Sequence, residues 1–112
     1  MIILSFDIGI KNLAYCMLDS EDGTILDWNL IDCTGVNETL RVIEELDQLE
    51  HLREADVILL EKQPSFNPKM RNISTAIYVY FMHCQLMLIK PACRHVIFLI
   101  PSSSIFREWP SP

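Results

Sequence analysis

The stretch from Val57 to Pro64, Val-Ile-Leu-Leu-Glu-Lys-Gln-Pro, constrains the fold of this chain more than any other part of its sequence. Its four consecutive apolar residues predict a strand that is covered on both faces, as the strands of parallel sheets are. Pro64 has no backbone N–H to donate and would end the strand. Glu61 is therefore expected at the carboxyl end of a central strand, where open α/β sheets place their ligands.

A second carboxylate, Asp7, has a similar setting near the start of the chain, after the apolar run from Ile2 to Phe6. If the two strands are neighbours, Asp7 and Glu61 would face each other at one edge of the sheet. Mg²⁺ keeps several waters, so one or two carboxylates and a phosphate can hold it. We interpret both acids as catalytic metal ligands. The alternative is that Asp7 only ends a strand and that Glu61 pairs with Lys62 or Lys11.

One globular domain is expected from 112 residues of which 50% are hydrophobic, with residues 1–101 as the folded part and residues 102–112 as an irregular tail. No stretch reaches the ~18 apolar residues that a membrane-spanning helix needs, so no membrane partner is expected. The cysteines show no zinc-site spacing and are expected to be buried thiols of an intracellular, reducing compartment. They are Cys16, Cys33, Cys84 and Cys93.

Three antiparallel strands are expected first, because the turns between them are short. Gly9–Asn12 and Ser20–Gly23 contain the glycine, asparagine and Asp-Gly signals of tight turns. The expected strands cover residues 2–8, 13–18 and 24–33.

A helix over residues 38–52 should follow, since apolar residues recur there with acids between them. This helix would make the strand over residues 57–61 parallel to a neighbour. The apolar positions of the helix are Leu40, Ile43, Leu46 and Leu49.

Asn67-Pro68 predicts the start of a long helix that runs to about Ile89 or Lys90, where Pro91 ends it. A last strand is expected over residues 95–100. Beyond its first turns the helix is apolar nearly all round, so one face can cover the sheet and the other predicts a homodimer interface. The residues assigned to that interface are Ile77, Tyr80, Phe81, Cys84 and Leu88.

Charge is unevenly distributed along the chain. Residues 1–61 hold 14 acidic and three basic residues, whereas residues 62–112 hold six basic residues and one acidic residue. A polyanion bound by the second half and an incidental surface charge explain this equally well. Polar and basic residues cluster directly after the two candidate ligands, and some of them begin a helix, where phosphate is favoured; the alternative is a solvated helix start. These candidate DNA contacts are Lys11, Asn12, Lys62, Gln63, Asn67, Lys69 and Arg71.

Two motifs resemble the RuvC-like Holliday junction resolvases of the RNase H-like superfamily, most of all those of poxviruses, iridoviruses and yeast mitochondria. Residues 5–14, Ser-Phe-Asp-Ile-Gly-Ile-Lys-Asn-Leu-Ala, resemble the opening of these enzymes. Residues 60–64, Leu-Glu-Lys-Gln-Pro, followed by Asn67, Lys69, Met70 and Arg71, resemble their second motif.

The resemblance implies an α/β fold with a mixed five-stranded sheet, whose first three strands are antiparallel, and flanking helices. It implies a homodimer that makes paired nicks in four-way DNA junctions with Mg²⁺, or Mn²⁺ as a substitute, held by Asp7 and Glu61. A viral protein of the host cytoplasm is the first expectation for its location, and the mitochondrion is the second.

The chain departs from this pattern after its last expected strand. The family completes its site with two more acids on a C-terminal helix, which this sequence lacks, and Glu108 is the only acid after Glu61. An incomplete carboxylate set is therefore expected. Two functions remain open: a junction-resolving endonuclease, and a catalytically deficient module that binds junctions and dimerises. Asp7-Ile8-Gly9 also resembles the first phosphate loop of sugar kinases and actin-like ATPases, which are much longer chains.

Overall fold

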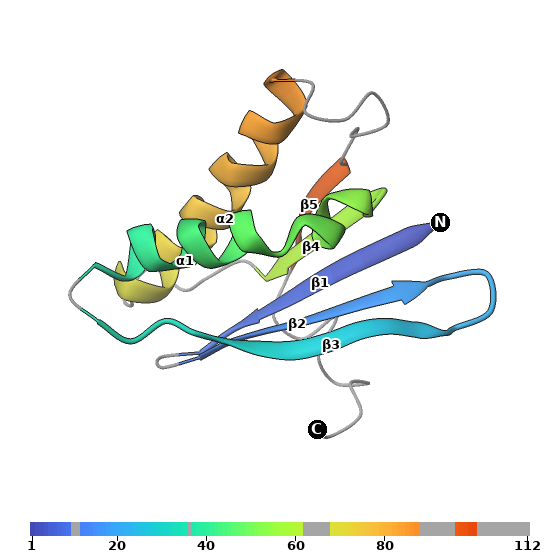
Figure 1. The fold of residues 1–112 in the computed structure, drawn as a ribbon, viewed down its shortest axis with the longest axis horizontal. Helices are drawn as coiled ribbons and strands as arrows, with labels where there is room; N and C mark the ends of the chain where they lie inside the picture. Colours follow the sequence, from blue (N-terminus) through green and yellow to red (C-terminus); the bar gives the residue numbers. More distant parts are fainter. Residues whose placement is uncertain (10–11, 36, 62–67, 88–95, 101–112) are drawn as a thin grey trace.

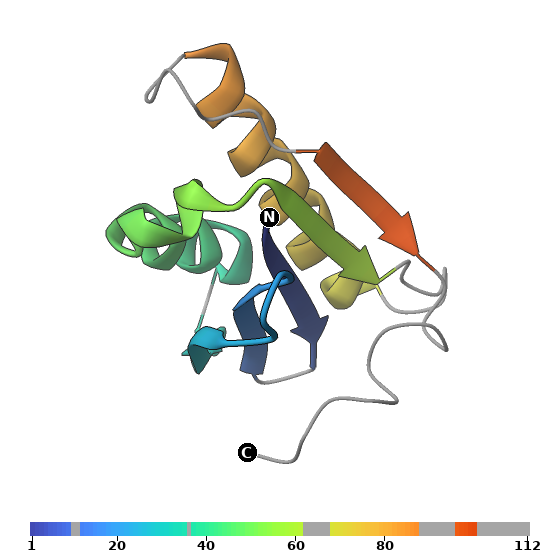
Figure 2. The same cartoon turned by 90° about the vertical axis from the view of Figure 1, so that its right-hand side faces the viewer.

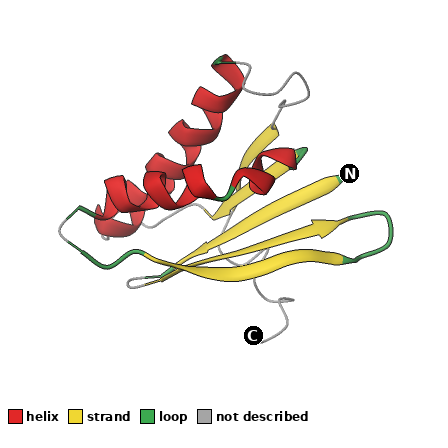
Figure 3. Cartoon of the chain, viewed as in Figure 1, coloured by secondary structure: helices red, strands yellow, loops and turns green. Residues whose placement is uncertain are grey.

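A computed structural model describes residues 1–9, 12–35, 37–61, 68–87 and 96–100 of the chain. These residues form one sheet and a layer of helices (Figures 1 and 3). In chain order the elements are β1 (Ile2–Ile8), β2 (Asn12–Asp19), β3 (Ile25–Asp32), α1 (Glu38–Gln48), the 3₁₀ helix η1 (Glu50–Glu54), β4 (Val57–Glu61), α2 (Pro68–Leu86) and β5 (Val96–Ile100).

The sheet has five strands in the order β3-β2-β1-β4-β5. Strands β1 to β3 form an antiparallel meander, and β4 lies parallel to both β1 and β5. The expected mixed sheet, with its antiparallel first three strands and its parallel crossover strand, is confirmed. The expected boundary between a domain of residues 1–101 and a tail of residues 102–112 stays a prediction, because the description ends at Ile100.

Both helices cover the same face of the sheet (Figure 2). The crossovers from β3 to β4 and from β4 to β5 advance in the same direction across the sheet, so connections of the usual right-handed sense place α1 and α2 on one side. Phe6 of β1 lies at the centre of the resulting core, with ring centroids 6.5 Å from Tyr15 and 6.0 Å from Phe81. The three expected buried thiols within the described residues, Cys16, Cys33 and Cys84, are buried and free.

The helix expected over residues 38–52 is confirmed over residues 38–48, but its end is wrong. The N–H of Leu49 bonds to the carbonyls of both Glu45 and Leu46, α1 ends, and the chain continues as η1. Leu40 is 51% exposed although it was expected on the buried face, whereas Val42 is fully buried. A spacing of three residues falls short of the 3.6-residue turn, so such a row drifts around an α-helix.

Four of the five residues assigned to a dimer interface face the wrong way for that role. Ile77, Tyr80, Phe81 and Cys84 are buried in the core of the single chain, where they cover the sheet. This assignment is therefore corrected. The opposite side of α2 carries the exposed apolar residues Tyr78, Val79, Met82 and Leu86. Leu88 and the expected end of the helix near residue 90 lie outside the described residues, as do Cys93 and His95.

The face of the sheet opposite the two helices is also apolar, and we call it the open face. Side chains alternate along a strand, so Ile3, Ser5 and Asp7 point away from the core that Leu4 and Phe6 enter. Cross-strand pairing aligns rows on this face: Ile25, Leu18, Ile3 and Val57; Trp28, Cys16, Ser5 and Leu59; Leu30, Ala14 and Asp7.

Two polar clusters fasten the helical layer to the sheet and to itself. The buried Tyr15 hydroxyl donates to the Asp27 carboxylate over 2.6 Å, and the His51 ring of η1 contacts the same oxygen. Arg53, also in η1, donates to the Tyr80 hydroxyl at 2.8 Å and to the Asp47 carboxylate at 3.0 Å. Because η1 takes part in both clusters, it links β3, α1 and α2.

The turn between β1 and β2 is closed by a hydrogen bond from the Gly9 N–H to the Asn12 carbonyl oxygen, 2.9 Å long. A Cβ on Gly9 would lie 2.9 Å from that oxygen, closer than ordinary carbon–oxygen contacts. Since the oxygen belongs to the backbone, it cannot move aside as a flexible side chain would. Glycine is required at this position because the Cβ of any other residue would clash with the Asn12 carbonyl oxygen.

Asp27→Ala is expected to lower the free energy of unfolding by about 1–3 kcal/mol, because the buried Tyr15 hydroxyl loses its acceptor. Burial opposes ionisation of Asp27, but the hydrogen bonds from Tyr15 and His51 and the charge of His51 outweigh it and lower its pKa. The contribution of a lowered pKa is complete above the unfolded value of ~3.9 and is lost as the pH falls through the folded value. Urea unfolding between pH 3 and 7 would measure both effects; equal stability of Asp27→Ala and the exposed control Gln48→Ala would contradict them.

Gly9→Ala is expected to destabilise the chain by about 1–3 kcal/mol, the usual cost of forcing an extra carbon into a closed site. Thermal or urea unfolding followed by circular dichroism would measure it. Glu21→Ala, in the exposed turn between β2 and β3, is the control and should change little. A Gly9→Ala variant as stable as the parent would show that the turn opens without cost.

Candidate metal and DNA site

Asp7 and Glu61 end two neighbouring parallel strands. Phe6 of β1 is paired with Leu60 of β4, and Asp7 and Glu61 are the next residues along the two strands. Neighbouring strands lie about 4.8 Å apart, so the backbones that carry the two carboxylates are adjacent. Both residues are half-buried, and the strand alternation places both on the open face.

The environment of Asp7 disfavours its charged form. Burial raises the pKa of the Asp7 carboxyl above its ordinary value. A divalent cation beside it would restore the charged form, because opposite charge favours ionisation. Two neighbouring carboxylates, one of them partly desolvated, are hard oxygen donors of the kind that Mg²⁺ takes together with water and phosphate. The two residues therefore fit a Mg²⁺ site that depends on further ligands.

A third His, Cys, Asp or Glu ligand is absent from the part of the chain that the structure describes. Its residues contain no group of three or more His, Cys, Asp or Glu side chains that could hold a metal ion. Glu108, the remaining acid of the sequence, lies outside the described residues. The candidate site thus consists of two carboxylates.

The hairpin between β1 and β2 fixes the position of the chain directly after Asp7. Ile8 pairs with Leu13, and the Gly9–Asn12 hydrogen bond closes the turn directly after the acid. Asn12, a candidate DNA contact, is the exposed first residue of β2. Asn12 therefore lies at the same edge of the sheet as Asp7.

The basic start of α2 supplies two further candidate contacts. Lys69 is half-buried and Arg71 is exposed, both within the first turns after Pro68. The charge of Lys69 acts on the Cys33 thiol, directly after β3, which places this base near the same edge. The candidates Lys11, Lys62, Gln63 and Asn67 lie outside the described residues.

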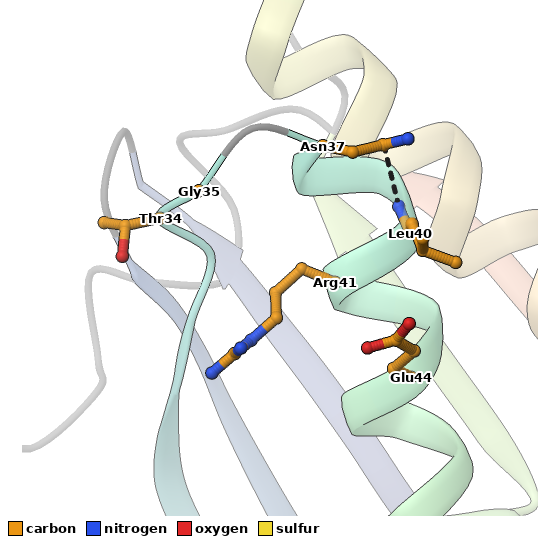
Figure 4. Close-up of a pocket in the computed structure, with 6 residues that line it drawn as sticks. All are labelled: Thr34, Gly35, Asn37, Leu40, Arg41 and Glu44. Carbon is orange, nitrogen blue, oxygen red and sulfur yellow. Dashed lines mark hydrogen bonds between the residues drawn. The ribbon is translucent and has the colours of Figure 1, made fainter.

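Sequence reasoning missed one feature at this edge. The segment between β3 and α1 and the first turns of α1 surround an open hollow of about 220 Å³ (Figure 4). Arg41 extends over it from α1. The only local signal was Asn37, whose side chain accepts from the Leu40 N–H as a helix N-cap does. The residues that line the hollow are Thr34, Gly35, Asn37, Leu40, Arg41 and Glu44.

No helix in the described residues is long and apolar enough to cross a membrane.

Three solved structures share this fold. RuvC of Thermus thermophilus in complex with a Holliday junction substrate is 8% identical, with a TM-score of 0.66 over 96% of this chain and 68% of RuvC. The yeast mitochondrial Holliday junction resolvase Ydc2 is 18% identical, with a TM-score of 0.57 over 88% of this chain and 52% of Ydc2. The fowlpox virus resolvase, in complex with its substrate junction DNA, is 26% identical, with a TM-score of 0.50 over 88% of this chain and 60% of the resolvase.

The chain thus spans about half of the yeast protein and three fifths of the fowlpox protein. None of the curated proteins compared with it matches. The family model of the Poxvirus A22 protein matches residues 1–103, nearly the whole sequence. The resemblance to RuvC-like resolvases that the two motifs indicated is confirmed, and the chain belongs to the family of the Poxvirus A22 protein.

Proposed function

We propose that this chain binds four-way DNA junctions and acts in their resolution by Mg²⁺-dependent cleavage of phosphodiester bonds. The observation that carries this proposal is the register of β1 and β4, which places Asp7 and Glu61 side by side at one sheet edge in a member of this family. The fowlpox and Thermus relatives, whose structures hold junction DNA, support the substrate class.

Asp7 and Glu61 would hold the metal ion, or Mn²⁺ in its place, on the open face. Bound there, the ion would supply an activated water and stabilise charge on the phosphate oxygens. Asp7 would be charged in that state, because the cation offsets the burial that raises its pKa. Lys69 and Arg71, with the basic and polar residues Lys11, Asn12, Lys62, Gln63 and Asn67, would contact the DNA backbone and position it without reading its sequence.

A second candidate function is junction binding without cleavage. The observation that favours it is the absence of a third carboxylate beside Asp7 and Glu61 in the described part of the chain. Such a site would bind a metal ion weakly, since affinity depends on the number of charged ligands. In this case the chain would be a module that holds DNA and a partner copy.

The partner copy would pack against the exposed side of α2. This side carries an apolar hollow of about 440 Å³, lined by Tyr78, Val79, Met82, His83 and Leu86. An exposed apolar stripe on a helix marks a contact surface, because a lone surface helix would carry polar residues there. The homodimer remains part of the proposal, with this face in place of the buried residues first assigned. A location inside the cell, in the host cytoplasm for a viral protein, also remains a prediction.

Cleavage of a synthetic four-way junction in Mg²⁺ is the first test. We expect paired nicks from the unaltered chain and a loss of roughly a hundredfold or more in Asp7→Asn, since an electrostatic contribution at the reaction site disappears. Glu21→Gln, which neutralises an acid far from the site, is the control. Junction binding without nicks by the unaltered chain would leave the second function, and the absence of both would refute both.

Met82→Glu is expected to shift the chain from dimer to monomer, because it places a charge in the apolar contact of α2. Sedimentation equilibrium at micromolar concentration would report the mass of each species. Gln48→Glu, on the exposed side of α1, should leave the dimer intact. A monomeric unaltered chain would refute the proposed interface.

A further inference from the structure

The hollow beside the start of α1 lies at the same sheet edge as the two carboxylates. Asp32, the last residue of β3, is paired with Asn12, the first residue of β2, and Asn12 closes the turn after Asp7. Strand β3 is two strands away from β1, about 10 Å across the sheet, and its residue level with Asp7 is Leu30, four residues before Thr34. The hollow therefore begins roughly 15 Å from the backbone of Asp7. A DNA strand that crosses this edge at Asp7 would therefore reach the hollow within a few nucleotides.

A basic residue of α1 and a basic residue of α2 both lie near the end of β3. Burial raises the pKa of the Cys33 thiol and the charge of Asp32 adds to the rise, whereas the charges of Lys69 and Arg41 act against it. Cys33 directly follows β3, so one base of α1 and one base of α2 lie near the end of the same strand. Lys69 is already a candidate DNA contact, and Arg41 extends this basic group along the edge.

The rest of α1 would repel a polyanion. Arg41 is the one basic residue between Glu38 and Gln48, and the exposed side of the helix carries the acids Asp47 and Glu44, of which Glu44 also lines the hollow beside Arg41. The approach of DNA from the outer side of α1 is therefore unfavourable. Only the end of the helix that carries Arg41 borders the basic part of the edge.

Arg41 contributes little to the stability of the fold. Its side chain is 46% exposed, and its Nε contacts the Glu45 carboxylate at 3.3 Å. Exposed pairs of this kind contribute little to the stability of a fold. A guanidinium has five N–H donors, so this contact leaves capacity for a phosphate. Figure 4 shows the guanidinium extended away from α1, toward the ribbon that leads from β3 to Thr34.

We propose that Arg41 binds a backbone phosphate of the junction arm at this hollow and positions the strand whose scissile bond lies at Asp7 and Glu61. The inference rests on the proposed junction binding and adds a specific contact to it. Arg41 would act on the DNA backbone and would carry no sequence preference. Glu45 would compete with the phosphate for the guanidinium.

Binding of a fluorescent four-way junction in the absence of Mg²⁺, measured over a range of salt concentrations, tests this contact. Arg41→Gln should weaken binding several-fold and reduce the slope of log K against log salt by about one, as the loss of one phosphate contact does. Arg41→Lys should keep the slope, because the charge remains. Glu45→Gln should tighten binding, because the competing carboxylate is gone.

The two variants Arg41→Gln and Glu45→Gln remove the same ion pair, so a purely structural role would make both weaken binding alike. That result would overturn the inference. Unchanged binding by Arg41→Gln, together with weaker binding by Lys69→Gln, would also overturn it and leave the proposed function standing. Failure of the unaltered chain to bind junctions would overturn both proposals.

Discussion

The parallel pairing of β1 and β4 is the constraint on which the rest of the structure depends. It joins the first strand of the chain to one that follows it by some fifty residues, and the helix α1 must cross the sheet to allow it. The same register places Asp7 and Glu61 at one edge. A shift of one residue would turn one carboxylate into the core, because side chains alternate along a strand. Fold and candidate site are therefore set by the same hydrogen bonds.

Much of this arrangement could be predicted from the sequence. The apolar run before Glu61 indicated a central strand, and turn residues indicated the meander. The end of α1 could not be predicted in this way. Leu46, Leu49 and Leu52 are spaced by three residues, which suits the 3₁₀ helix η1 as well as an α-helix, and only the hydrogen bonds of Leu49 show where one becomes the other.

The orientation of α2 was equally hidden. Its two sides carry apolar residues at the same helical spacing, so periodicity gives no reason to bury Ile77 and expose Val79. Which side of α2 is buried depends on the path of the chain over the sheet, and periodicity alone does not predict that path. The two acids could be proposed as metal ligands because each ends an apolar strand beside a motif. Arg41 could not be proposed as a DNA contact from the sequence, because a single basic residue among the acids of α1 gives no signal until the fold places it at the hollow. The family match also decides against the ATPase resemblance of Asp7-Ile8-Gly9.

The open face has a consequence for the behaviour of the chain in solution. Ile25 and Leu30 on this face are about half exposed, and both described helices cover the other side of the sheet. Such a surface attracts its like, and the net charge of −6 is what keeps separate molecules apart. Acid that brings the chain near its isoelectric point of about 4.9, or salt that screens its charges, weakens this repulsion while the apolar contact persists. Association through the open face should therefore be weakest at neutral pH and low ionic strength.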